Sequence, residues 1–270
     1  VNFAADVTFA DGADIITASA GTSNFRAGVN AGNSIQSGGN YNTVVGDEAG
    51  TAITTGDLNT AFGFQALKTN TTGQQNIAIG SDALRDNTDG QYNVSLGTDA
   101  LRLSSTGDSN TAIGHQALTA NTTAGNNTAV GYQSLLANTT GYNNVAIGAN
   151  ALDANTTATN NVAVGSDALT TNTTGTNNTA IGLSAMHSNT TGTENNAIGV
   201  TSLYANTEGN NNIALGHVAL RFNTTGDNNV ALGHKALYSN ATGSENTAVG
   251  NEASYGNTAN SSTSYGHRAL

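Results

Sequence analysis

The chain has 270 residues, a net charge of −11 and no cysteine, proline or tryptophan. The absence of cysteine excludes disulfides and zinc–thiolate sites, and the acidic balance argues against nucleic-acid partners and anionic membrane surfaces. With 37% hydrophobic and 9% charged residues, the composition is unlike that of an ordinary packed globular domain, and no apolar run is long enough to predict membrane insertion.

The first element in chain order, residues 1–41, lacks the regular pattern that follows. Val1–Phe9 alternates apolar and polar residues as a strand does. Asn24–Gly28 is similar to the later repeat but lies one residue out of step. We interpret residues 1–41 as an N-terminal lead-in that caps the following stack and contributes one degenerate coil.

Residues 42–270 repeat a 17-residue phrase, roughly Asn-Thr/Val/Ile-Ala-Ile/Val/Leu-Gly-x-x-Ala-Leu-x-x-Asn-Thr-Thr-Gly-x-Asn. We number its positions 1 to 17, so that Asn144 occupies position 1 and Gly148 position 5. A unit this short cannot bury its own apolar face and must stack on its neighbours. Position 4 is apolar in every unit, which favours order over low-complexity disorder.

The unit length suits one coil of two short strands and two turns. We therefore predict an all-β fold, a parallel β-solenoid (β-roll) of about 13 coils, with a shaft of roughly 60 Å. At 265–270 the phrase restarts after a one-residue deletion, and we expect the coil to continue in a longer protein.

Each position of the repeat suggests a structural role. We expect position 4, as in Ile79 and Ile147, to fill the coil interior together with position 9, as in Leu152. Alanine at positions 3 and 8 is small enough to let another backbone approach, and thin cores favour association. The pattern therefore predicts parallel rods packed side by side.

Glycine and asparagine recur too often to be catalytic, so we assign them to the scaffold. Position 5 requires a positive φ or a close approach to a neighbour, and asparagines at positions 1 and 12 are expected to form ladders between coils. The representative residues are Gly80, Gly114, Gly148, Gly182, Gly216, Asn121, Asn138, Asn155 and Asn172.

The phrase Asn-Val-Ala-Ile-Gly-x-x-Ala-Leu at 144–152 resembles the repeats of YadA-like heads of trimeric autotransporter adhesins. The longer phrase, ending in Asn-Thr-Thr-Gly, is more similar to repeat arrays of bacteriophage tail-fibre proteins, and Val7–Gly12 also resembles tail-fibre sequence. The resemblance covers residues 42–270. It implies a left-handed parallel β-roll, a homotrimer around one axis, and attachment to a bacterial surface from a virion tail fibre. The alternative is an adhesin head on the bacterial cell surface.

Position 10 is the strongest candidate for recognition. Basic and aromatic side chains in a row along a rod could contact the sugar rings and anionic groups of a polysaccharide. The competing interpretation is a solvated face, with Asp82 or Asp99 offsetting the basic charge. A spacer whose recognition tip lies beyond Leu270 is the alternative to binding along the shaft. The candidate glycan-binding residues are Lys68, Arg85, Arg102, Tyr204, Arg221, Phe222, Tyr238 and Tyr255.

Other functions have weaker support. His217 and His234 at position 6 are weak metal candidates because no second ligand type accompanies them. No catalytic pair or triad stands out from the repeat, so we expect neither an enzyme nor a cofactor. Threonine at position 13 from Thr71 to Thr224 leaves an ice-binding solenoid as a remote alternative, although these threonines lie in a turn instead of on a flat strand face.

Overall fold

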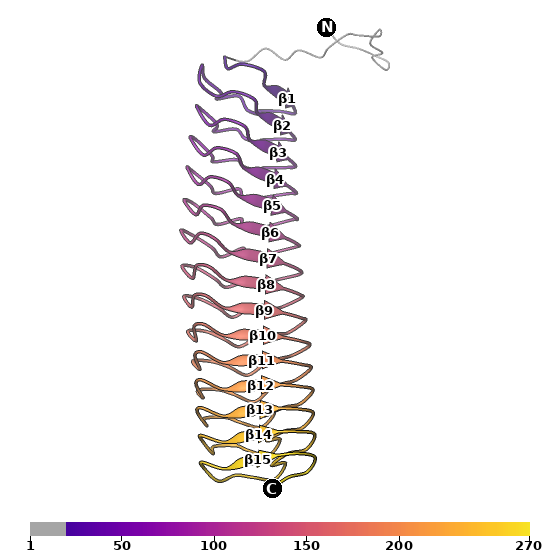
Figure 1. Ribbon diagram of the computed structural model, residues 1–270. Coiled ribbons are helices and arrows are strands. Elements are labelled where there is room, and N and C mark those ends of the chain that lie inside the picture. Colours follow the sequence, from indigo (N-terminus) through magenta and orange to yellow (C-terminus); the bar gives the residue numbers. More distant parts are fainter. Residues whose placement is uncertain (1–19) are drawn as a thin grey trace, which may run out of the picture.

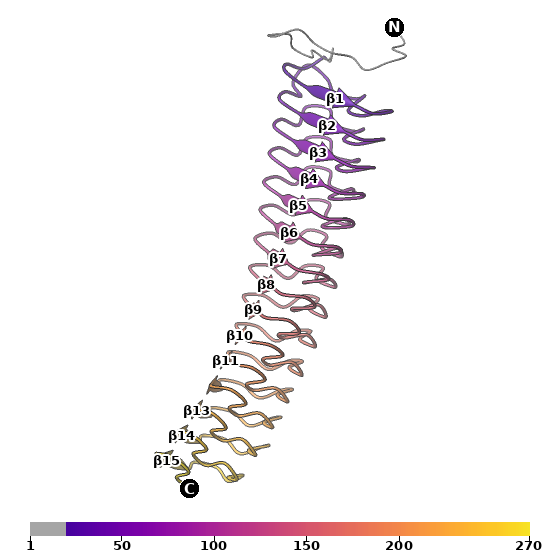
Figure 2. The same cartoon turned by 90° about the vertical axis from the view of Figure 1, so that its right-hand side faces the viewer.

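The computed structural model describes residues 20–270, so the expected strand at Val1–Phe9 and the tail-fibre-like Val7–Gly12 lie outside the described residues. The described chain coils repeatedly in one direction and forms a long rod (Figures 1 and 2). Strand β1 lies at one end and β15 at the other, and every strand pairs only with its neighbours in sequence. The predicted parallel β-solenoid is therefore confirmed.

Each coil contributes one three-residue strand to a single parallel sheet of fifteen strands. The strands are β1 (Phe25–Ala27), β2 (Thr43–Val45), β3 (Thr60–Phe62), β4 (Ile77–Ile79), β5 (Val94–Leu96), β6 (Thr111–Ile113), β7 (Thr128–Val130), β8 (Val145–Ile147), β9 (Val162–Val164), β10 (Thr179–Ile181), β11 (Asn196–Ile198), β12 (Ile213–Leu215), β13 (Val230–Leu232), β14 (Thr247–Val249) and β15 (Thr263–Tyr265).

The register of the sheet follows the sequence period. Between β2 and β14 each residue pairs with the residue 17 positions further on, as Ala146 does with Ala163. At the ends the spacing changes: Phe25 of β1 pairs with Thr43 and Thr247 of β14 pairs with Thr263. The one-residue shifts in the sequence at these two places are thus absorbed in the turns, and the ladder of parallel pairs continues through them.

The prediction of two strands per coil is wrong, because the segment that returns from each strand is not extended. In this return segment, positions 7 and 9 have positive φ, as in Gln116 (57°) and Leu118 (54°). The N–H of Gln116 donates to Thr98 in the preceding coil at 3.0 Å, whereas that of Leu118 donates to Ser134 in the following coil at 2.9 Å. The backbone groups are therefore paired between coils without forming a second regular sheet.

The interior of the coil is lined by alanine at positions 3 and 8 and by leucine at position 9. Ala146, Ala151 and Leu152 are all fully buried. Where serine replaces alanine at position 3, Ser95 Oγ donates to the carbonyl of Ala100 at position 8 over 2.8 Å. Position 3 of the strand therefore faces the return segment of the same coil across a narrow interior.

The expected placement of position 4 in this interior is wrong. The strands show buried residues at position 3 and outward residues at positions 2 and 4, and Ile147 and Ile181 are 41% and 38% exposed. The alanines accordingly do not face a neighbouring rod. Small side chains at position 3 are required because leucine from the facing segment already fills the space between the two walls.

Buried asparagines satisfy the backbone where the coil turns. At position 1, Asn144 Nδ2 donates to the carbonyl of Ala158 at 2.9 Å, and the Asn144 N–H donates to Asn127 Oδ1, also at 2.9 Å. At position 12 the side chains bond directly to one another, as Asn155 Nδ2 does to Asn138 Oδ1 at 2.8 Å. The position 12 ladder also includes Asn121 and Asn172, whose bonds to Asn138 and Asn155 are 3.2 and 3.1 Å long.

Glycine at position 5 is fixed by backbone geometry and by the stack. A Cβ at Gly182 would lie 2.6 Å from the carbonyl oxygen of Gly199 in the next coil. The backbone is in the left-handed region with φ between 133° and 137° at Gly80, Gly114, Gly148, Gly182 and Gly216. A side chain at this position would separate successive coils and be strained as well.

Candidate interaction surfaces

The outer face of the sheet carries an uncharged stripe at positions 2 and 4. From β2 to β15, position 4 is apolar or aromatic throughout and position 2 is threonine, valine, isoleucine or, in β11, Asn196. The side chains are well exposed: Ile79 at 36%, Leu96 at 42% and Leu215 at 40%. Because the chain carries a net charge of −11, an uncharged stripe along the rod is a distinct surface, and no part of residues 20–270 covers it.

The apolar surface continues around the turn onto position 6 in several coils. Phe64, Tyr132 and Leu183 are each 50 to 51% exposed, and Val200 is 42% exposed. These residues follow directly after the position 5 glycine, on the far side of the strand end. The apolar surface is therefore bent, with the strand on one side of the turn and position 6 on the other.

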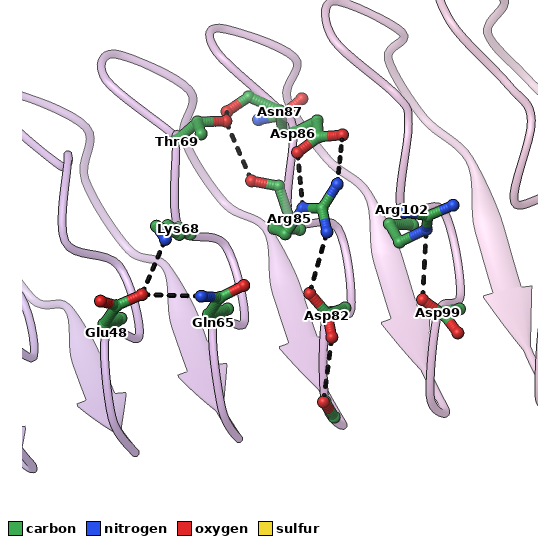
Figure 3. Close-up of polar contacts among 11 residues, drawn as sticks. Glu48, Gln65, Lys68, Thr69, Asp82, Arg85, Asp86, Asn87, Asp99 and Arg102 are labelled. Carbon is green, nitrogen blue, oxygen red and sulfur yellow. Dashed lines mark hydrogen bonds and ion pairs between the residues drawn. The ribbon is translucent and has the colours of Figure 1, made fainter.

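The basic residues predicted for glycan binding in the first coils are neutralised by carboxylates of the rod. Figure 3 shows them along the return segments, and Lys68 Nζ lies 2.7 Å from Glu48 Oε2. Arg85 is held by two residues, with Nε 2.7 Å from Asp86 Oδ1 and Nη1 3.2 Å from Asp82 Oδ1.

Arg102, in the next coil, also pairs with the aspartate three residues before it. Its Nε lies 3.2 Å from Asp99 Oδ1. The hydrogen bond from Lys68 lowers the pKa of Glu48, and the hydrogen bond to Asp86 raises the pKa of Arg85. The acids at position 7 thus supply the counter-anions that a row of like charges requires, as the solvated-face interpretation supposed for Asp82 and Asp99.

The aromatic residues at position 10 stack along the rod axis. His187 stacks on Tyr204 with ring centroids 5.0 Å apart and planes inclined by 15°. Tyr238 and Tyr255 stack with centroids 5.0 Å apart and an inclination of 8°. Their ring faces are therefore turned toward each other, and stacking on sugar rings has fewer free faces than the sequence suggested.

Arg221 and Phe222 join these two stacks. The guanidinium carbon of Arg221 lies 5.6 Å from the Tyr204 ring centroid and 5.5 Å from that of Phe222. Phe222 in turn meets Tyr238 edge to face, with centroids 5.0 Å apart. The five position 10 and 11 residues predicted in the later coils thus lie together, separate from the ion-paired coils that contain Lys68, Arg85 and Arg102.

Two further residues belong to this cluster. His187, itself at position 10, caps the stack at one end. Lys235, at position 7, lies 6.0 Å from the Tyr255 ring centroid. Sequence reasoning missed Lys235, because a search of position 10 alone overlooks side chains that reach it from position 7.

The candidate metal ligands His217 and His234 stack on each other with centroids 5.4 Å apart. His234 Nδ1 lies 3.2 Å from Asn251 Nδ2, a neutral amide. Within residues 20–270 no group of three or more His, Cys, Asp or Glu side chains comes together as a metal site. The two histidine rings stack between neighbouring coils, as the rings of His115 and Tyr132 do nearer the N-terminus.

The threonines at position 13 use their hydroxyls within the rod. Thr122 Oγ1 and Thr173 Oγ1 each donate to a threonine carbonyl in the next coil at 3.1 Å. These donors are occupied, which disfavours the ice-binding alternative.

In the part of the chain that the structure describes, no helix is long and apolar enough to cross a membrane. No protein-family model matches the chain, and no curated protein or solved structure matches it either. Function is therefore inferred from the surfaces of the rod itself.

Proposed function

We propose that this chain is part of the shaft of a rod-like homotrimer, a phage tail fibre that extends toward a bacterial host and presents or contacts its surface glycans. In this proposal the protein is not an enzyme and requires no cofactor. The observation that carries the proposal is the uncharged stripe at positions 2 and 4, which follows the rod from β2 to β15 and is exposed to solvent in a single chain.

The size of this surface supports self-association. With a strand spacing of about 4.8 Å and about 3.3 Å per residue, positions 2 to 4 cover roughly 60 Å by 7 Å, or about 400 Å². Apolar patches of this size mark interaction sites. Extending the surface to position 6 doubles it to about 800 Å². In a ring each copy divides this area between two neighbours, so about 400 Å² per partner falls on each contact, about half of what each partner contributes to an interface of standard size.

The shape of the surface supports three copies instead of two. A fibre that presents one end requires all copies to point the same way, so the symmetry axis runs along the rod. The apolar surface has two sides that meet at the position 5 glycine, with Ile181 on the strand and Leu183 after the turn. One side of each copy can then contact the other side of the next, and such head-to-tail contacts close into a ring.

The first experiment measures the molar mass of the purified chain in solution by light scattering. We expect three times the 27.0 kDa chain mass. The double variant Ile147→Glu/Ile181→Glu places buried charges in the interface and is expected to give single chains with unchanged circular dichroism. The matched control, Thr174→Glu at an exposed turn position, should remain trimeric. A wild-type monomer would overturn the trimer.

Host attachment is tested separately by the adsorption of labelled protein to bacterial strains before and after their surface polysaccharide is removed. Binding that depends on the polysaccharide supports contact along the shaft. A trimer that adsorbs to no strain acts as a spacer between other parts of a fibre. The alternative of an adhesin head uses the same surfaces, and neighbouring genes for tail components or for an outer-membrane anchor distinguish the two.

A further inference from the structure

Arg221 differs from the other arginines of position 10 in its immediate neighbours. In the coil of Arg85, the residue three positions earlier and the residue immediately after it are Asp82 and Asp86, and both pair with the guanidinium. The corresponding positions around Arg221 hold Val218 and Phe222. Arg221 makes no ion pair with any residue in 20–270, so its charge is uncompensated by the rod.

The aromatic rings hold this charge in place without using its hydrogen bonds. Arg221 lies against Tyr204 and Phe222, and its Nε is buried with no hydrogen-bond partner. Because Nε is buried, a ligand would meet the terminal Nη groups, which stacking on aromatic rings leaves free to donate to a planar anion such as a carboxylate or phosphate. Fixing the side chain beforehand also reduces the entropy lost when a ligand binds.

A second cation, Lys235, belongs to the next coil. Lys235 is 6.0 Å from the Tyr255 ring centroid, and its closest carboxylate, Glu252, is 3.9 Å away. Glu252 already pairs more tightly with Arg268, at 2.6 Å. Lys235 and Arg268 therefore share the single carboxylate of Glu252, whereas Arg221 has none.

We propose that this surface, the Arg221 patch, binds the carboxylate- or phosphate-bearing units of an acidic polysaccharide; the patch comprises Tyr204, Arg221, Phe222, Lys235, Tyr238 and Tyr255. Because the tyrosine faces are stacked on one another, the ligand meets ring edges, the exposed Phe222 and the guanidinium. Recognition is then by charge-assisted hydrogen bonds more than by ring stacking. The proposal rests on the proposed function and restricts glycan contact to the later coils.

The patch and the uncharged stripe lie on different sides of the coil, so both can be occupied together. Position 3 of the strand faces the return segment, as the bond from Ser95 to Ala100 shows, and the stripe points away from it. Position 10 belongs to the return segment. A rod docked on the stripe therefore leaves the Arg221 patch open to a ligand. A linear polyanion lying along the rod would meet a new coil about every 4.8 Å.

The test measures binding of three soluble polymers to the full chain by isothermal titration calorimetry: polygalacturonate, poly(ribitol phosphate) teichoic acid and neutral dextran. We expect at least one anionic polymer to bind, with affinity that falls as salt rises, and dextran not to bind. Arg221→Gln should weaken binding by about tenfold or more, and Arg221→Lys by less. Arg85→Gln, which removes an arginine already paired in the rod, should change affinity by less than about twofold.

Equal binding of dextran, an undiminished affinity of Arg221→Gln, an equal loss in Arg85→Gln, or no binding of either anionic polymer would each overturn the proposal. The two anionic polymers distinguish a carboxylate ligand from a phosphate ligand. Circular dichroism of each variant checks that the coil persists, and Arg221→Lys keeps the comparison valid if Arg221→Gln unfolds.

Molar mass, measured on the same samples, separates this inference from the proposed function. A trimer that binds no anionic polymer refutes the Arg221 patch alone. A monomer refutes the trimer, while the comparison of Arg221→Gln with Arg85→Gln still decides the patch. A loss of mass on Arg221→Gln would show that the patch instead contacts a second copy of the chain.

Discussion

Replacing Asn178 with alanine tests whether the buried asparagines hold the coils together. Asn178 Oδ1 accepts the backbone N–H of Asn195 in the next coil at 3.0 Å, and its Nδ2 donates to the carbonyl of Gly192 at 2.8 Å. Asn178→Ala removes both bonds from a site with no solvent access. It also removes the bond that Asn178 Oδ1 accepts from Asn195 Nδ2 at 3.2 Å, but Asn195 Nδ2 keeps its bond to the Gly209 carbonyl at 2.8 Å. The free-energy cost, however, differs between the two backbone partners, the Asn195 N–H and the Gly192 carbonyl.

The Asn195 N–H has no other acceptor and becomes a buried unsatisfied donor, which costs about 1–3 kcal/mol. The Gly192 carbonyl keeps a second bond, from Asn189 Nδ2 at 3.0 Å. Losing the bond from Asn178 therefore costs only the net value of one hydrogen bond, about 1 kcal/mol. The sum is about 2–4 kcal/mol, concentrated between two neighbouring coils.

The assay is native-state hydrogen exchange, because a rod of repeats opens locally and a single unfolding midpoint averages over many coils. We expect the protection of amides in the coils of Asn178 and Asn195 to fall by about 2–4 kcal/mol in opening free energy, with little change in distant coils. Protection of the Asn195 coil within about 0.5 kcal/mol of wild type would refute the reasoning.

The adjacent Asn177 provides a matched control. It is exposed and has a φ of 58°, so Asn177→Gly removes an amide of the same chemistry without orphaning a buried group. We expect a change within about 0.5 kcal/mol. A similar loss at both sites would mean that the exposed amide matters as much as the buried one, and that the buried hydrogen bonds are not the cause.

Three further predictions follow from single positions. Gly182→Ala should disrupt the stack, because its Cβ would lie 2.6 Å from the Gly199 carbonyl oxygen, and thermal melting should show a loss larger than about 2 kcal/mol; an unchanged melting temperature would contradict this. Thr201→Gly should stabilise the rod by about 0.5–1 kcal/mol, because a β-branched residue is strained at a φ of 49°, and a lower urea midpoint would count against that account. Burial raises the pKa of Asp153, so its carboxyl group binds a proton more tightly in the folded protein than in the unfolded chain. Its charge therefore costs stability as the pH rises above the ordinary carboxyl range. Asp153→Asn should stabilise the protein at pH 7 and lose this advantage at pH 3, and an advantage independent of pH would exclude the charge as its cause.

The recurrence of glycine and asparagine made the architecture predictable. A 17-residue period with position 5 always glycine admits only a stack in which successive glycines lie together, and Gly148 and Gly165 do lie in adjacent coils. The position 10 candidates were also predictable as a row, because equal spacing in sequence becomes one line along a solenoid. The sequence suggested that Asp82 or Asp99 offsets the basic charge, and the structure shows which cations are paired and which are not.

That distinction depends on contacts between positions of the same coil. Arg85 and Arg221 occupy the same position of the repeat, yet only Arg85 has carboxylates on both sides. The pairing depends on which residues occupy positions 7 and 11, because the backbone at position 7 is left-handed in both coils, with a φ of 55° at Asp82 and 53° at Val218. This conformation is uncommon for residues other than glycine, and most of all for a β-branched residue such as Val218.

The sequence by itself determined the period, the parallel register and the turn residues, because each is a local requirement repeated at every coil. Only the tertiary structure decided which side of the strand is buried. Larger side chains such as Ile147 suggested burial, whereas the structure buries Ala146 instead. The two walls of the coil lie too close together for large residues from both, and since adjacent strand residues face opposite ways, filling the narrow interior with Leu152 leaves the isoleucines outside.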